Sequence, residues 1–351
     1  MCSFANLNGG DVIYGIRDER DGNGRPTGVP ESIEALGALN FSAECERLES
    51  IIRDGIKPRV PNVRTRGIEI AGQGPVLILR IGKSWIKPHM VTFKGTSRFY
   101  SRHSSGKYQL DVQEIGQAFA EQRSLGEQLR NWRAERITRI LSDEGPVPVE
   151  GPSRVMLHFA PAGVFSGLRA SVPWPISNAV RAALRPSSLS AVLWRYNADG
   201  FLVASVDESV RAYAAYVQLF RDGRLEYVDG DILNAGKRYG AGREWEIPSQ
   251  SFEQKLTSTF ANAMLVINQI GVSDPIYFSV ALLGVMQMKL SRSGLWEMGD
   301  KHTFDRNVIQ TPETQIDRSE EPPYRSSLLP IVDSIWQANG YEGTPWTKNW
   351  A

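Results

Sequence analysis

A run of prolines and glycines near the middle of the chain most constrains how it can fold. Residues 145–152 read Gly-Pro-Val-Pro-Val-Glu-Gly-Pro, and prolines and glycines at this density cannot continue a helix. The 351 residues also amount to about two domains at roughly 150 residues each. We therefore predict a first domain of residues 1–144, a linker of residues 145–152 and a second domain of residues 153–351.

The composition is that of a soluble globular protein. Apolar residues make up 41% and charged residues 23% of the chain, which argues against global disorder and against a membrane-embedded protein. The longest apolar tract, residues 276–288, is shorter than the roughly 20 residues of a spanning helix, so we expect a buried helix and no membrane partner. The net charge of +1 excludes a globally basic nucleic-acid binder but leaves room for a local basic face.

The two cysteines are too few for a disulfide framework or a four-cysteine zinc site. Cys2 and Cys45 therefore favour a reducing, cytoplasmic location. The acidic residues among the first 30 positions, with no long apolar core, argue against a secretory signal. These features name no cofactor and leave the oligomeric state undetermined.

The first domain has the pattern of a mixed α/β sheet domain. We expect strands at residues 11–16, 75–81 and 97–101, and the nearly continuous apolar run 75–81 is typical of a strand covered on both faces. Residues 43–54 suit a helix that is ended by Gly55 and Pro58, and helical spacing predicts one or two helices over residues 111–142. Asp111 with Glu114 three residues on is a capping-box pattern.

The second domain has the pattern of an α+β domain, so the fold class expected for the whole chain is α+β. Two turn sequences predict hairpins, Asn197-Ala198-Asp199-Gly200 and Asp222-Gly223. Strands are expected at residues 155–159, 191–196, 201–205, 217–220 and 225–228. Helices are expected at residues 252–269, 276–290 and 328–338.

The strongest chemical signal is a window without acids. From Ile70 to Leu110 there is no Asp or Glu, and cations without acids create a local positive field. Cations hold phosphates and aromatic faces stack on unpaired bases, and aromatic residues are interleaved here. The alternative is a solvated sheet face with its aromatics in the core. The residues expected to bind nucleic acid or phosphate are Lys83, Lys87, His89, Lys94, Arg98, Arg102 and Lys107.

A nucleotide is the alternative ligand for the same window. Ser104-Ser105-Gly106-Lys107 ends in the Gly-Lys pair of a phosphate-binding loop. The match fails at Ser101, where the first glycine should stand, and at Tyr108, where a Mg²⁺-binding Ser or Thr should follow.

Few carboxylates are placed for catalysis. Asp18 follows the first expected strand, where a side chain can reach a site, and it is the candidate catalytic and metal-binding residue. A single Asp is a weak metal ligand, and metal-dependent phosphodiester hydrolysis needs several carboxylates together. The alternative is a loop Asp. Asp229 and Asp231 have the pattern of turn residues, and His158, inside an apolar strand, that of a core histidine.

The N-terminal residues resemble a known family. Residues 3–18, Ser-Phe-Ala-Asn-Leu-Asn-Gly-Gly-Asp-Val-Ile-Tyr-Gly-Ile-Arg-Asp, are similar to the Phe-Ala-Asn helix end, Gly-Gly turn and first strand of the AlbA_2 domain of Schlafen-like proteins. Later segments fit the same pattern: Ile56-Lys57-Pro58, Lys87-Pro88-His89 and Phe99-Tyr100-Ser101-Arg102. The resemblance covers roughly residues 1–125; the second domain resembles no family that we can name.

The resemblance implies a mixed α/β domain that binds nucleic acid or, in an alternative description, ATP. RNA-cleaving Schlafen relatives place three carboxylates around a metal, and Asp18 matches the third. The first two lie in a segment before the Phe-Ala-Asn helix, so we expect an N-terminally incomplete domain in a chain that starts at Met1. The leading hypothesis is a cytoplasmic nucleic-acid-binding protein. The alternatives are an ATP-binding protein, a metal-dependent RNase or a structural interaction protein, and whether the chain is an enzyme stays open.

Overall fold

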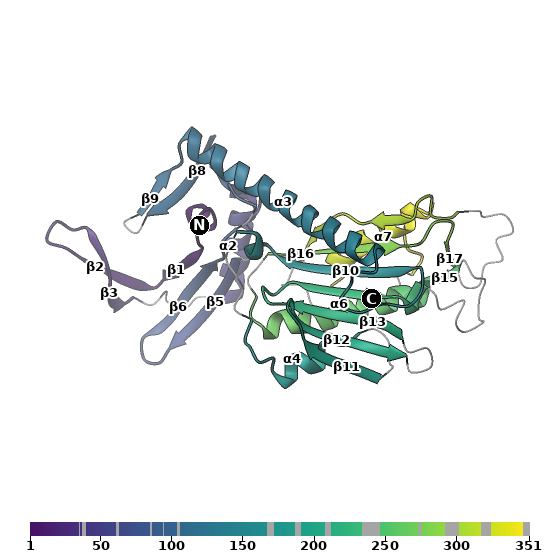
Figure 1. Cartoon of the computed structure of the whole chain (residues 1–351). Coiled ribbons are helices and arrows are strands. Elements are labelled where there is room, and N and C mark those ends of the chain that lie inside the picture. The colour runs from purple at the N-terminus through teal and green to yellow at the C-terminus, as the bar shows by residue number, and fades with distance from the viewer. Residues whose placement is uncertain are drawn as a thin grey trace. The chain divides into compact units, whose positions relative to one another are not determined.

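The computed structural model forms two compact units, Met1–Gly126 and Glu127–Ala351 (Figure 1). Each unit has its own sheets and its own core, and both combine helices with antiparallel strands, which confirms the α+β class. The structure describes residues 1–34, 36, 40–60, 63–84, 86–93, 95–103, 106–166, 172–186, 191–207, 212–233, 246–272, 275–291, 302–316 and 324–346.

The described residues of the N-terminal unit form three small antiparallel sheets, with strand orders β1-β6-β5, β2-β3 and β4-β7-β8-β9. Its strands are β1 (Gly10–Tyr14), β2 (Ile16–Arg20), β3 (Pro26–Ile33), β4 (Ile56–Lys57), β5 (Val63–Ile70), β6 (Gly74–Ile81), β7 (Met90–Phe93), β8 (Thr96–His103) and β9 (Gly106–Gln109). Its helices are α1 (Cys2–Ala5), α2 (Phe41–Gly55) and the first part of α3 (Val112–Leu141).

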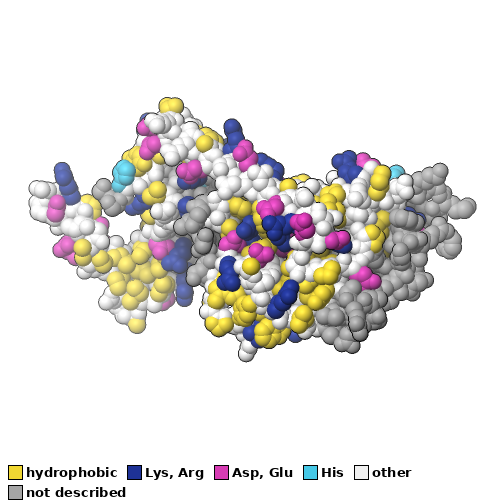
Figure 2. All heavy atoms as spheres, viewed as in Figure 1, with side chains coloured by type: hydrophobic (Ala, Val, Ile, Leu, Met, Phe, Trp, Pro, Cys, Tyr) yellow, Lys and Arg dark blue, Asp and Glu magenta, His cyan; other side chains and the backbone are white. Residues whose placement is uncertain are grey.

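The core of this unit lies on one face of the β1-β6-β5 sheet. Leu79 and Ile81 of β6 are fully buried there with Ile52 of α2. On the opposite face Arg80 is exposed and Ile13 of β1 is 46% exposed, and Figure 2 shows hydrophobic side chains over this part of the unit. The expectation that residues 75–81 are covered on both faces therefore holds for part of the strand: Val76 and Leu77, whose side chains point to opposite faces, are both buried.

Helix α3 belongs to both units. Asp111 and Glu114 form the expected capping box: the Glu114 amide donates to Asp111 Oδ1 at 2.8 Å, and the Asp111 amide donates to Glu114 Oε2 at 2.9 Å. Phe119 contacts Phe99 in the first unit, whereas Ile137 is part of a core cluster in the second. The division between units at Gly126 and Glu127 thus falls inside this helix.

The Pro/Gly segment 145–152 packs within the second unit. Val147 and Val149 are buried in the same cluster as Ile137, and the Glu150 amide donates to the Tyr213 carbonyl at 2.9 Å. Prolines and glycines end α3 and turn the chain, but the alternating valines give the segment a buried face. The segment predicted as a linker thus contributes two side chains to the core of the second unit.

The second unit is built on one large antiparallel sheet of order β11-β12-β13-β14-β10-β16-β18, with β19 also paired to β16. The sheet strands are β10 (Arg154–Pro161), β11 (Ala191–Tyr196), β12 (Gly200–Asp207), β13 (Ala212–Phe220), β14 (Leu225–Asp229), β16 (Ile276–Leu283), β18 (Val308–Gln310) and β19 (Thr314–Gln315). Separate from it are the short pair β15 (Glu246–Pro248) and β17 (Lys289–Ser291), the 3-10 helix η1 (Ala162–Ser166) and the helices α4 (Asn178–Ala183), α6 (Ser249–Gln269) and α7 (Arg325–Ala338).

Helices cover both faces of this sheet. On one face, α6 and α7 contribute Phe260 and Trp336 to the larger core cluster, and on the other, α3 contributes Ile137 and Ile140. The helices predicted at residues 252–269 and 328–338 are confirmed as α6 and α7. The two predicted hairpin turns are confirmed between β11 and β12 and between β13 and β14.

The helix predicted at residues 276–290 is wrong. Residues Ile276–Leu283 form strand β16, which pairs with β10 over its whole length, and Gly284 follows with a φ of 69°. A short apolar run fits a buried helix and a central strand equally well. Because both faces of this sheet are covered, the strand needs apolar residues at every position. Among the helices that the structure describes, none is long and apolar enough to cross a membrane.

A buried ionic cluster lies between α3 and the sheet. Arg136 donates two hydrogen bonds of 2.7 Å to the Glu226 carboxylate, which also accepts from Tyr216 Oη at 2.7 Å and lies 3.0 Å from His158 Nε2. Burial lowers the pKa of His158, and despite burial the bonds from Arg136 and His158 lower the pKa of Glu226 to about 2. His158 is confirmed as a core histidine, and its cluster joins the part of α3 that belongs to the second unit to the sheet of that unit.

We expect Glu226→Gln to destabilise the second unit, because it leaves the Arg136 charge buried without its partner; losses of this kind are about 3–5 kcal/mol. The carboxyl pKa is lower in the folded state, so its contribution is present above the ordinary pKa of 4.5 and is lost as the pH falls toward about 2. Urea unfolding of both proteins at neutral and acidic pH measures this. Equal stability at neutral pH would contradict the assignment.

Candidate nucleic-acid interface

Asn6 holds together the segments that carry the sequence motifs of the N-terminal unit. Its Oδ1 accepts from the His89 amide at 2.7 Å, and its Nδ2 donates to the carbonyls of His89 at 3.0 Å and Tyr100 at 2.8 Å. The His89 ring in turn lies 2.8 Å, through Nδ1, from the Pro58 carbonyl. One buried amide thus ties α1 to strand β8 and to the segment before β7.

The Gly-Gly turn after α1 lets the chain approach β6 closely. Gly9 has a φ of 78°, and a Cβ there would lie 2.6 Å from the Ile81 carbonyl oxygen and 2.8 Å from the Lys83 nitrogen. Only glycine fits both the conformation and the space. The turn therefore places α1 against β8 while β1 pairs with β6.

Three of the predicted phosphate-binding residues share one face of the β7-β8-β9 sheet. Arg98 and Arg102 are four residues apart on β8, and Lys107 of β9 lies directly opposite Arg102. Because side chains alternate along a strand, Arg98, Tyr100 and Arg102 project from the same side. Arg98 and Lys107 are exposed and Arg102 is partly exposed. We call these three cations the β8–β9 basic face.

Aromatic rings lie directly beneath these cations. The Arg102 guanidinium is 3.8 Å from the centroid of the Phe4 ring of α1, and Lys107 Nζ is 5.6 Å from that of Tyr100. The opposite face of the sheet packs on α3, where Phe99 meets Phe119 and Tyr108 Oη donates to Glu114 Oε1 at 2.9 Å. Glu114 therefore lies behind the sheet, away from the basic face.

The remaining lysines expected in the interface are paired or fall outside the described residues. Lys87 forms an ion pair of 2.7 Å with Glu121 of α3. Lys83 feels the charges of both Lys87 and Glu121, and partial burial lowers its pKa. The neighbouring Arg80 donates to both carboxylate oxygens of Asp11. Lys94 lies outside the described residues.

His89 lies in the interior of the unit, and the structure therefore removes it from the expected surface. Its side chain is fully buried, and its Nε2 has no hydrogen-bond partner among the described residues. Burial lowers the pKa of the imidazole, so the ring is neutral at physiological pH and supplies no charge to a phosphate. The Lys87-Pro88-His89 motif serves packing through the contacts with Asn6 and Pro58.

Asp18 lies in β2, opposite Pro30 of β3, and is partly exposed. Among the described residues no three His, Cys, Asp or Glu side chains gather closely enough to hold a metal ion. The donor set of a metal-dependent nuclease therefore does not fit the residues described around Asp18, and we derive no catalytic step from it.

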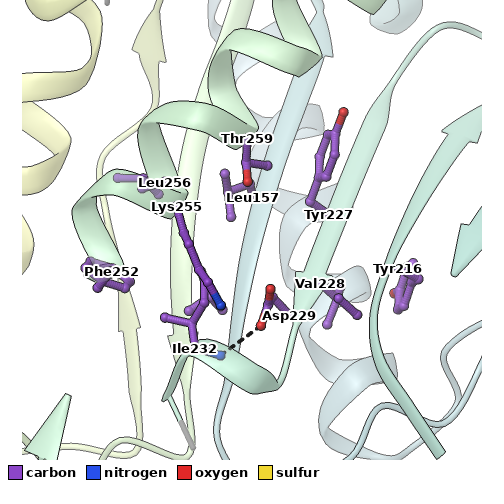
Figure 3. Close-up of a pocket in the computed structure, with 12 residues that line it drawn as sticks. Leu157, Tyr216, Tyr227, Val228, Asp229, Ile232, Phe252, Lys255, Leu256 and Thr259 are labelled. Carbon is purple, nitrogen blue, oxygen red and sulfur yellow. Dashed lines mark hydrogen bonds between the residues drawn. The ribbon is translucent and has the colours of Figure 1, made fainter. Parts of the chain in front are cut away.

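A pocket of the second unit lies between strands β10, β13 and β14 of the sheet and helix α6, and Asp229 is one of its lining residues (Figure 3). Asp229 Oδ1 accepts from the amides of Asp231 at 2.7 Å and Ile232 at 2.9 Å, while its Oδ2 is buried without a partner among the described residues. Lys255 of α6 reaches Asp231 at 3.3 Å. Burial raises the pKa of Asp229 to about 6. The sequence pattern identified a turn residue but not its burial.

The N-terminal part of the chain matches the model of a known protein family. Residues 1–111, about a third of the chain, match the family model described as Schlafen, AlbA_2, which confirms the resemblance. At the family level this match indicates a nucleic-acid-related function. No curated protein and no solved structure matches the chain.

We expect Asn6→Ala to destabilise the N-terminal unit by about 2–4 kcal/mol, because it leaves the buried His89 amide and the Tyr100 carbonyl without partners. Urea unfolding measures the loss, and Asn8→Ala, at an exposed position two residues along, is the control. A stability equal to that of the control would show that the Asn6 contacts are dispensable.

We expect Asp229→Asn to stabilise the protein more at high than at low pH. The Asp229 pKa is higher in the folded state than its ordinary 3.8, so the folded state binds more protons and wild-type stability falls as the pH rises from about 4 to about 6. The gain from the variant should be about 2 kcal/mol larger at pH about 7.5 than at pH about 4.5. Unfolding curves at both pH values measure it; a gain independent of pH would contradict the buried, unpartnered carboxyl.

Proposed function

We propose that the N-terminal unit binds single-stranded nucleic acid through the β8–β9 basic face. The observation that carries the proposal is the register that places Arg102 opposite Lys107, with Arg98 on the same side of β8. No carboxylate among the described residues pairs with any of the three. Cations that are not neutralised within the protein are available to phosphates, and each contact releases counterions from the polymer.

The rings beside these cations favour an unpaired strand over a duplex. Tyr100 lies on the same face between Arg98 and Arg102, and Phe4 supports the Arg102 guanidinium. Guanidinium planes and aromatic rings stack on bases that are not paired, whereas the bases of a duplex are stacked on one another. The family match supports a nucleic-acid ligand.

The proposal assigns Lys83 and Lys87 a minor part. Lys87 is largely buried and its charge is neutralised by Glu121, so the attraction of a phosphate to this ammonium is offset by the carboxylate beside it. We therefore expect the cations of β8 and β9 to account for most of the phosphate contacts.

The test is a salt titration of binding to a labelled single-stranded RNA oligonucleotide, with the full chain. Affinity should fall steeply with salt, and the triple variant Arg98→Ala/Arg102→Ala/Lys107→Ala should reduce the slope of log K against log salt by about 2, or roughly 0.7 for each lost phosphate contact on a single strand. Single- and double-stranded DNA of the same length and ATP serve as competing ligands.

The matched control is Arg64→Ala/Arg66→Ala, which removes two exposed arginines from β5 of the same unit. This variant should retain most of the slope of log K against log salt, because the two arginines that it loses lie on a different sheet from the β8–β9 basic face. Equal losses in the control and the triple variant, or wild-type affinity that does not change with salt, would refute binding at the β8–β9 basic face.

A further inference from the structure

The edge of the large sheet in the second unit is a strand with little protection against pairing. β11 is the first strand in the sheet order, so one side of it bonds to β12, and no described strand pairs with the other side. Proteins usually guard such edges with charges, prolines or bulges. Here residues 192–196, Val-Leu-Trp-Arg-Tyr, hold one charge and no proline, and β11 pairs with β12 without a bulge.

The hairpin turn shows which backbone groups face outward. Asn197 and Gly200 exchange hydrogen bonds in both directions, at 3.0 and 3.3 Å. Residue pairs that exchange backbone hydrogen bonds alternate with pairs that do not along an antiparallel ladder. Because Asn197 and Gly200 form a hydrogen-bonded pair, the backbone groups of Arg195 and Leu193 also form hydrogen bonds with β12. The amides and carbonyls of Val192, Trp194 and Tyr196 therefore point to the open edge.

The side chains of the strand are also exposed on both faces. Val192 is 51%, Leu193 43%, Trp194 47% and Tyr196 44% exposed. Figure 2 shows hydrophobic side chains gathered at the margin of the second unit, in the region of β11 and α4. Trp194 is held in place from within by the Arg181 guanidinium of α4, 4.1 Å from its ring centroid, and by Phe201. The edge thus offers ordered backbone groups together with apolar area.

We propose that β11 pairs with β11 of a second copy of this chain, antiparallel and centred on Trp194, to join two sheets into one. In this register the outward residues bond to one another: Trp194 faces its own counterpart, and Val192 faces Tyr196. Pairs of an aromatic and a β-branched residue are among the favoured cross-strand contacts.

Charge favours this register for two copies of the strand. Arg195 is the one charged residue of β11, and centring on Trp194 places it opposite the apolar Leu193 of the other copy. A shift of the centre by one residue toward the turn would place Arg195 opposite itself, and like charges directly opposite are destabilising. The centred register also pairs every residue from Val192 to Tyr196.

The test compares Leu193→Glu with Leu193→Lys by sedimentation equilibrium of the full chain across the micromolar range. Both variants place a charge at the same exposed position. In the proposed register, residue 193 of each copy lies opposite Arg195 of the other copy, so the dimer contains two such charge pairs. The wild type should dimerise, Leu193→Glu should tighten the dimer and Leu193→Lys should weaken it. Because each cross-strand charge pair contributes roughly 0.2–1 kcal/mol, the dissociation constants of the two variants should differ by about tenfold.

Val29→Glu and Val29→Lys are the controls, since Val29 of β3 is 53% exposed in the other unit; they should leave the dimer unchanged. Circular dichroism checks that all variants fold. A wild type that stays monomeric across the range would overturn the proposal. So would a dimer that responds equally to both charges at Leu193, or as strongly to charges at Val29.

Discussion

The N-terminal unit depends on the buried side chain of Asn6. Its amide satisfies the backbone of His89 in both directions and the carbonyl of Tyr100, so the N-terminal segment meets residues that lie 83 and 94 positions further along the chain. A buried amide group that lacks its partners is costly, and this makes the arrangement specific. The basic face follows from it, because α1 is held where Phe4 lies beneath Arg102.

The acid-free window was informative about charge but not about position. Among the residues that the structure describes, the cations of β8 and β9 have no carboxylate partner, but acids outside the window neutralise other cations: Glu121 pairs with Lys87, and Asp11 with Arg80. A one-dimensional count cannot show which strand or helix supplies the compensating charge. It likewise could not show that His89 faces inward.

Most of the elements could be predicted from periodicity, capping and turn residues, as at Asp111 and Asn197. The strand at Ile276–Leu283 could not, because a sheet covered on both faces removes the alternation that distinguishes strand from helix. The importance of Asn6 and the burial of Asp229 could not be predicted either. Both depend on contacts between distant segments, although the Phe-Ala-Asn motif had already marked Asn6 as part of a pattern.

Hydrogen–deuterium exchange of the full chain, with and without a single-stranded RNA oligonucleotide at low salt, tests the central claim most directly. A ligand bound across β8 and β9 should slow the exchange of peptides that cover residues 96–109 and of the α1 segment that packs on them, and salt should reverse the effect. Slowed exchange confined to the second unit, or to the β1-β6-β5 sheet, would contradict the account.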